Sequence, residues 1–216
     1  MFVKICGIRD VDTACSVADC RPDAIGLNFY RQSARWLDVR MAERICRSLP
    51  AEVEPIGVFV NHPLEEILEI TRNCRVATVQ LHGDEPVELA SRLVDAGLEV
   101  IRALRIDDAN VGRLAEFVAE YRSVPLRALL VDARMAGAYG GTGRTAPWEP
   151  LTTAWQCDWP PLLLAGGLTP DNVAAAIAAS GCWGVDTAGG VESGPAIKDP
   201  ARVRAFISAA RDGHST

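Results

Sequence analysis

The sequence predicts a single (β/α)8 TIM barrel, because apolar runs of strand length alternate with amphipathic segments along the whole chain. Leu37, Met41, Ile45 and Leu49 illustrate the segments between the runs, since an apolar residue recurs there every four positions, as on one face of a helix. Strict alternation is typical of a parallel sheet covered by helices, and eight units in 216 residues favour a closed barrel over an open sheet. The eight predicted strands are Phe2–Cys6, Ala24–Leu27, Ile56–Val60, Ala77–Leu81, Val100–Leu104, Ala128–Val131, Pro161–Leu164 and Trp183–Asp186.

The rest of the sequence is consistent with one soluble domain. No linker or charge block interrupts the pattern, so residues 1–211 are predicted to form the barrel and residues 212–216 a polar, disordered tail. A net charge of −6 gives no general attraction to nucleic acid or to anionic membranes, so neither is a predicted partner. No apolar run is long enough for a signal peptide or a membrane span, which predicts a cytoplasmic protein.

The cysteines predict neither a metal site nor a disulfide framework. They are seven in number, are spread along the chain and include no Cys-x-x-Cys pair. Most of them are expected to be small buried residues in a reducing compartment.

In a TIM barrel the functional residues lie at the carboxyl ends of the strands. Cys6 ends the first predicted strand and Asp132 follows the sixth, and these strands are three steps apart around an eight-stranded ring. The two side chains are therefore expected to face each other across the mouth, where one can act as an acid and the other as a base. A carboxyl group in apolar surroundings tends to stay protonated and to serve as a general acid. Cys6 is alternatively a small core residue, and Asp132 a helix cap or salt-bridge partner.

Three glycine-rich loops follow the last three strands and predict a phosphate site. They contain Gly141, the pair Gly166 and Gly167, and the pair Gly189 and Gly190. Backbone N–H groups of such loops bind phosphate in many barrels, although a single glycine pair is also common in plain turns.

The charged residues around these loops suggest how the anion is held. The loops after strands seven and eight contain no Arg or Lys, and Lys198 is the nearest cation along the chain. We therefore expect phosphate on backbone amides and on the N-terminus of a short helix that begins near Val191.

Three further residues are candidates for the site. Arg35, in the long loop after strand two, can receive a carboxylate in a bidentate fork, unless it is a solvated loop cation. His82, by itself, is more readily explained as a hydrogen-bonded structural histidine. Lys4 shares the inner face of strand one with Cys6, so its ammonium needs a buried carboxylate, and Asp186 on the adjacent eighth strand is the expected partner.

Taken together, the motifs resemble those of the phosphoribosylanthranilate isomerase family nearly end to end. The matching stretches are Lys4-Ile5-Cys6-Gly7, Asp23-Ala24-Ile25-Gly26, Ser33-Ala34-Arg35, Gly57-Val58-Phe59-Val60-Asn61, Gln80-Leu81-His82-Gly83-Asp84-Glu85, Leu130-Val131-Asp132, Gly140-Gly141-Thr142-Gly143, Leu164-Ala165-Gly166-Gly167-Leu168, Gly184-Val185-Asp186, Gly190-Val191-Glu192 and Lys198-Asp199.

The resemblance implies a cofactor-free Amadori rearrangement of N-(5-phospho-β-D-ribosyl)anthranilate to 1-(2-carboxyphenylamino)-1-deoxy-D-ribulose 5-phosphate in tryptophan biosynthesis. It implies that Cys6 is the general base, that Asp132 is the general acid, and that Arg35 holds the anthranilate carboxylate. The glycine loops, with His82 nearby, would complete a site for a phosphorylated small molecule. The protein is expected to be a monomer or a homodimer. The chain departs from the family pattern at Ala188 and Gly189, where relatives usually carry a serine, and at Ala196, where glycine is common.

Two rival functions are weaker. A Schiff-base aldolase needs a lysine at the end of strand six, and the two lysines of the chain, Lys4 and Lys198, are elsewhere. A broad-specificity isomerase that also serves histidine biosynthesis would favour an aspartate at position 6.

Overall fold

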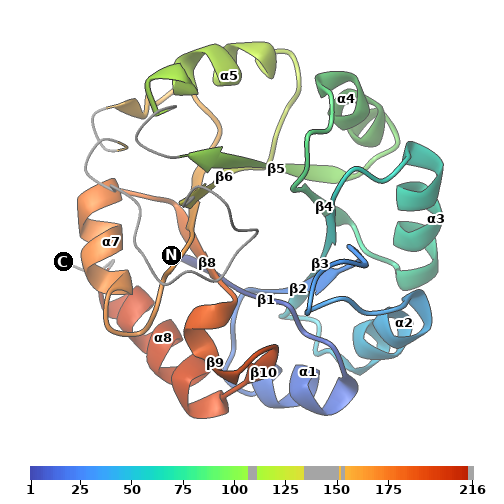
Figure 1. Cartoon of the computed structure of the whole chain (residues 1–216), viewed down its shortest axis with the longest axis vertical. Coiled ribbons are helices and arrows are strands. Elements are labelled where there is room, and N and C mark those ends of the chain that lie inside the picture. The colour runs from blue at the N-terminus through green and yellow to red at the C-terminus, as the bar shows by residue number, and fades with distance from the viewer. Residues whose placement is uncertain (107–110, 134–150, 152–153, 214–216) are drawn as a thin grey trace.

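The computed structural model describes residues 1–106, 111–133, 151 and 154–213, and eight parallel strands within them form a closed barrel (Figure 1). Each strand pairs with the next, and β8 pairs with β1 to close the ring. The strands are β1 (Phe2–Cys6), β2 (Ala24–Asn28), β3 (Glu54–Phe59), β4 (Thr78–Leu81), β5 (Glu99–Ile106), β6 (Ala128–Ala133), β7 (Leu162–Ala165) and β8 (Gly184–Thr187). The predicted TIM barrel is confirmed, and every predicted strand overlaps an observed one.

Helices surround the barrel (Figure 1). The α-helices are α1 (Val11–Ala18), α2 (Val39–Ser48), α3 (Leu64–Cys74), α4 (Val87–Asp95), α5 (Leu114–Glu120), α7 (Val173–Ser180) and α8 (Pro200–Asp212), and a 3-10 turn, η1 (Val111–Arg113), precedes α5. Acidic caps begin three of them, since carboxylates of Asp10, Asp38 and Asp199 accept hydrogen bonds from backbone N–H groups of the first turn. No helix in the described part of the chain has the length and apolar character needed to cross a membrane.

The chain after β8 departs from the plain alternation of strand and helix. A 3-10 turn, η2 (Gly189–Val191), leads into a small antiparallel hairpin of β9 (Glu192–Gly194) and β10 (Ile197–Lys198). The sequence analysis expected a helix beginning near Val191. That expectation was wrong, because the turn begins at Gly189 and the backbone is already extended at Glu192.

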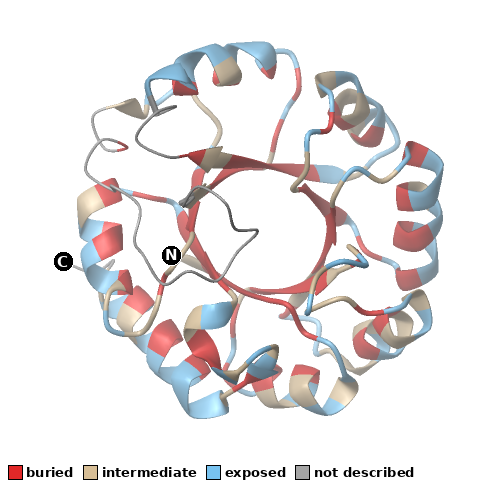
Figure 2. Cartoon of the chain, viewed as in Figure 1, coloured by how far each residue is buried: buried red, intermediate tan, exposed pale blue. Residues whose placement is uncertain are grey.

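Buried residues make up most of the barrel wall and the helix faces turned toward it (Figure 2). An outer core lies between the strands and the helices and includes Val3 and Ile5 of β1. The inner core is a separate apolar cluster that consists of Ala24, Ile56, Ile101, Ala103, Ala128, Leu130, Leu163 and Ala165. Because side chains alternate along a strand, Lys4 and Cys6 point into the barrel.

The amino ends of the strands form the opposite end of the barrel from the mouth. There Arg127 donates to Glu54 at 2.6 Å and 2.7 Å and to Glu99 at 2.8 Å. This cluster joins the first residues of β3 and β5 to the connection before β6 at the bottom of the barrel.

The predicted division of the chain at residue 211 stays a prediction. Helix α8 ends at Asp212, and residues 214–216 lie outside the described part of the chain.

Candidate active site

Cys6 lies at the barrel mouth in a tight backbone environment. A Cβ atom on Gly26, its neighbour on β2, would come within 2.6 Å of the Cys6 sulfur, so this glycine makes room for the thiol. Gly7 has a φ of +84°, and a Cβ there would come within 2.3 Å of Cδ of Arg35. At both positions a larger residue would collide with a neighbouring side chain. The two glycines therefore allow the backbone to pack closely against Cys6 and Arg35.

The electrostatic surroundings of Cys6 differ from the expected ones. A thiol that acts as a general base would be expected to be accessible, but Cys6 is only 9% exposed. Burial raises the pKa of the Cys6 thiol above its ordinary value, while the ammonium groups of Lys4 and Lys198 act in the opposite direction. The predicted pair of Lys4 and Asp186 is confirmed, with 3.0 Å between Nζ and Oδ1 and no exposure of Lys4.

Asp132 lies at the end of β6, three strands from Cys6 around the ring. Its side chain is 27% exposed, and its Oδ2 atom lies 3.5 Å from Nε2 of His82. The other ring nitrogen of His82 lies 2.8 Å from Nε2 of Gln80. The structure therefore brings His82 to the candidate acid, whereas the sequence left open whether it faced the site at all. That His82 contacts substrate stays a prediction.

A buried network that the sequence analysis missed fixes the loop that carries His82. Both carboxylate oxygens of Glu85 accept backbone N–H groups, of Asn61 and Gly83, at 2.8 Å each. Arg102 donates to Glu85 at 3.1 Å and to the Gly83 carbonyl at 3.1 Å. Glu85 belongs to the matching motif around His82, and its place in that motif was the one feature of the sequence that pointed to a role for it.

Arg35 makes an ion pair that the sequence did not predict. Its Nε and Nη2 atoms donate to the two oxygens of Glu192 at 2.7 Å and 2.8 Å. Lys198 donates to the same carboxylate at 2.8 Å and to the Ala188 carbonyl at 2.9 Å. Burial alone would raise the pKa of Glu192, but its hydrogen bonds to the two cations outweigh this and hold the pKa below its ordinary value. We call Arg35, Glu192 and Lys198 the Glu192 cluster.

The Glu192 cluster brings a second cation, Arg35, to the loop that follows β8. Nη2 of Arg35 lies 3.4 Å from the position that a Cβ of Gly189 would take, so a cation distant in sequence borders this loop. Lys198 is therefore not the only cation nearby. The substituted Ala196 has a φ of +58°, a region that favours glycine, and its N–H donates to Glu192 at 3.1 Å.

The described glycine loops lie side by side after β7 and β8. Gly166 and Gly167 have φ values of +84° and +66°, which few other residues adopt without strain. A Cβ on Gly190 would come within 1.8 Å of the Leu168 carbonyl oxygen, which also accepts the Thr187 hydroxyl at 2.8 Å. The two loops thus touch through backbone. Gly141 lies outside the described residues.

These contacts predict opposite outcomes for two adjacent glycines. Because these loops are predicted to bind phosphate, Gly190→Ala is expected to raise KM at least about tenfold. The Leu168 carbonyl has to move and the paired loops separate, which would cost at least one charge-assisted hydrogen bond to the anion. Gly189→Ala is the matched control, since its Cβ meets only the flexible end of Arg35. Steady-state kinetics checks the pair, and equal KM values in both variants would contradict the predicted loop contact.

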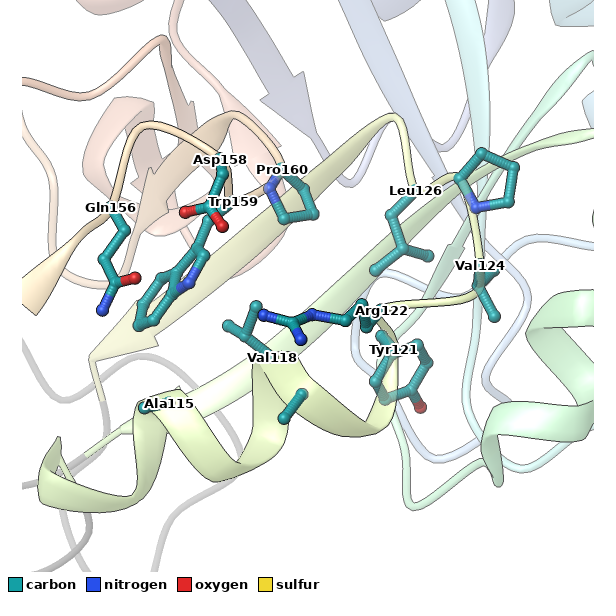
Figure 3. Close-up of a pocket in the computed structure, with 12 residues that line it drawn as sticks. Ala115, Val118, Tyr121, Arg122, Val124, Leu126, Gln156, Asp158, Trp159 and Pro160 are labelled. Carbon is teal, nitrogen blue, oxygen red and sulfur yellow. The ribbon is translucent and has the colours of Figure 1, made fainter.

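A cavity elsewhere in the molecule does not belong to this site. It measures about 470 Å³ and lies between α5 and the segment that contains Trp159 and Pro160 (Figure 3). Its lining comes from connections that precede β6 and β7, so it lies toward the amino ends of these strands, away from Cys6 and Asp132. Among the described residues, no three His, Cys, Asp or Glu side chains are grouped so that they could hold a metal ion.

Comparisons with known proteins identify the family of the chain. Residues 3–209 match the model of the N-(5'phosphoribosyl)anthranilate (PRA) isomerase family. An N-(5'-phosphoribosyl)anthranilate isomerase of Geotalea daltonii is 42% identical over 97% of this chain and 96% of its own length.

Solved structures resemble the fold equally well. The phosphoribosyl anthranilate isomerase of Thermotoga maritima superposes with a TM-score of 0.89 at 34% identity, over 98% of this chain and 99% of that one. A complex of such an isomerase with reduced 1-(o-carboxyphenylamino)-1-deoxyribulose 5-phosphate gives a TM-score of 0.84 at 32% identity, with the same coverage. With the barrel, the paired glycine loops and the matching motifs in place, the chain belongs to the phosphoribosylanthranilate isomerase family of tryptophan biosynthesis.

Proposed function

We propose that Cys6 and Asp132 carry out the acid–base chemistry of the family reaction, the isomerisation of N-(5-phospho-β-D-ribosyl)anthranilate to 1-(2-carboxyphenylamino)-1-deoxy-D-ribulose 5-phosphate. One observation carries the proposal. A thiol and a carboxyl group end β1 and β6, which β7 and β8 separate within the closed ring. This spacing leaves the substrate a position between a base and an acid.

The two groups act on different bonds of the substrate. The protonated carboxyl of Asp132 gives its proton to the furanose ring oxygen, and the bond from C1′ to that oxygen breaks as the anthranilate nitrogen supplies its electron pair. The thiolate of Cys6 then takes the proton from C2′, and those electrons neutralise the iminium group. The resulting enolamine tautomerises to the ketone. Each group contributes about 10²–10⁴ to the rate if it acts as general acids and bases usually do.

Arg35 is proposed to bind the anthranilate carboxylate with the edge of its guanidinium that Glu192 does not use. Glu192 engages Nε and Nη2, and a guanidinium has a second bidentate edge formed by its two terminal nitrogens. Glu192 takes two of the five N–H groups of the guanidinium, so three remain for the substrate carboxylate. His82, beside Asp132, is proposed to face the reacting sugar.

The phosphate is proposed to bind at the glycine loops after β7 and β8, at the backbone amides of Gly166, Gly167, Gly189 and Gly190. Gly141, in a loop outside the described residues, is proposed to border the same site. The complex of a relative with a reduced, phosphorylated product analogue supports a ligand of this class. We expect a monomer or a homodimer, which sedimentation equilibrium distinguishes.

Consumption of the anthranilate-labelled substrate tests the proposed function directly. The purified protein is expected to extinguish the fluorescence of phosphoribosylanthranilate and to do so equally well after treatment with EDTA, because no metal or cofactor takes part in the proposed steps. An untreated sample is the control. Persistent fluorescence would contradict the function, and activity that EDTA removes and a divalent ion restores would contradict the mechanism.

A further inference from the structure

A buried ion pair lies inside the barrel next to Cys6, and the steps proposed above do not use it. Lys4 is completely buried and Asp186 is 7% exposed, with 3.0 Å between the ammonium nitrogen and Oδ1. The two residues are direct partners in the ladder between β1 and β8. Strand alternation places Lys4 and Cys6 on the same inner face, while Ile5 between them packs in the outer core.

Stability of the barrel gives no sufficient reason for this pair. The inner core beside it consists of apolar side chains such as Ile56, Ile101 and Leu130. Removing two charges from water is costly, and well-packed apolar residues in place of a buried ion pair are often neutral or stabilising. The position of the pair beside the thiol therefore calls for a different explanation.

Charged groups reach Cys6 from four elements. Lys4 comes from β1, Asp186 from β8, Lys198 from β10, and Arg35 from the loop after β2. Arg35 and Lys198 both donate to Glu192, so their charge is largely committed within the Glu192 cluster. Lys4 is the cation on the same strand and the same face as the thiol.

We propose that Lys4 is a positioning residue for Cys6, and that its ammonium, oriented by Asp186, stabilises the thiolate that takes the substrate proton. This inference rests on the proposed role of Cys6. The thiol first loses its proton to water. The thiolate then takes the C2′ proton, so that an S–H bond forms as the C–H bond breaks and the negative charge beside Lys4 disappears. Lys4 stays protonated throughout.

The electrostatics of the site agree with this role. Burial is the largest influence on the pKa of Cys6 and raises it, and the Lys4 ammonium is the strongest charge that lowers it. The Asp186 carboxylate acts against the thiolate, but less strongly than Lys4 acts for it. Removing both members of the pair is therefore expected to raise the pKa of Cys6 further.

The decisive variant is the double substitution Lys4→Met with Asp186→Asn, which removes both charges and leaves none unpaired. Alkylation of Cys6 by iodoacetamide is followed at pH 8 through the mass of its peptide, because only the thiolate reacts. We expect the rate to fall at least about tenfold, which corresponds to one pKa unit. The rise of kcat/KM with pH is expected to move to higher pH in parallel.

Two further variants separate this role from a structural one. Arg127→Met removes a cation at the other end of the barrel and is expected to leave alkylation of Cys6 unchanged. Lys4→Arg keeps the positive charge beside Asp186 and is expected to keep the rate within about threefold of wild type, since a threefold change is only about half a pKa unit. If the double variant does not fold, Lys4→Arg still decides, because a tenfold slower alkylation in it overturns the proposal.

An unchanged alkylation rate in a folded double variant would also overturn the proposal. The alkylation rate does not depend on turnover. The role of Lys4 and the proposed function are therefore tested by separate measurements. Full activity of Cys6→Ser would remove Cys6 as the base while leaving the effect of Lys4 on the thiolate measurable.

Discussion

Cys6→Ser and Asp132→Asn are each expected to lower kcat at least about a hundredfold, with far smaller changes in KM. General acid–base catalysis is typically worth 10²–10⁴ in rate, and neither replacement retains the proton affinity that its step requires. Both changes are close to isosteric. Serine is smaller than cysteine and fits in the same space beside Gly26, and asparagine retains a group that can meet His82. The loss is therefore expected in chemistry rather than in folding.

Steady-state kinetics and circular dichroism check this prediction together. Cys15→Ser is the matched control, because Cys15 is exposed on α1 and distant from the mouth. Turnover within a few-fold of wild type in either active-site variant would remove that residue from its proposed role.

Glu192→Gln is expected to destabilise the fold and to weaken substrate binding at the same time. Loss of one partner of a buried ion pair costs about 3–5 kcal/mol, because the remaining charges lose their compensation. Here Lys198 is almost fully buried, and Arg35 loses a bidentate partner at 2.7 Å and 2.8 Å. An Arg35 that is no longer held in place binds a carboxylate less well, so KM is expected to rise at least about tenfold through the weakening of one charge-assisted hydrogen bond.

Urea denaturation and KM measure the two effects separately. Glu43→Gln is the matched control, since Glu43 pairs with Arg47 on the surface at 3.3 Å, where an ion pair contributes at most about 1 kcal/mol. A Glu192→Gln variant with the stability and KM of this control would show that the Glu192 cluster plays no such part.

The pH dependence of stability follows from the same carboxylate. The pKa of Glu192 is lowered in the folded protein, so its contribution to the free energy of unfolding is complete above the unfolded pKa and is lost as the pH falls through the folded pKa. The stability difference between wild type and Glu192→Gln should therefore shrink on acidification below about pH 4.

The strands could be predicted from the sequence because their signal is local. An apolar run such as Leu129, Leu130 and Val131 indicates a buried strand whatever the rest of the chain does. The ends were less accurate for a physical reason. The ladder between β5 and β6 continues through Arg105 and Asp132, whose polarity conceals their strand conformation.

The parts of the candidate site that lie on the strands could be predicted from the order of the strands and from the alternation of side chains along each strand. Those two rules were sufficient for Lys4 and Asp186, which are ladder partners on adjacent strands. They could not predict the pairing of Arg35 with Glu192, because both residues lie outside the eight barrel strands and are separated by 157 positions. Such contacts depend on loop paths, which no periodicity encodes.

The ion pair between Lys4 and Asp186 has a consequence for the synthesis of the protein on the ribosome. The two residues are 182 positions apart, so the lysine is synthesised long before the aspartate. A buried ammonium without a carboxylate is unfavourable, so in the nascent chain Lys4 is expected to stay hydrated until β8 has left the exit tunnel. Strand β1 is then expected to reach its final environment only after β8 has been made, and a ribosome stalled before residue 184 should display β1 in a protease-sensitive form.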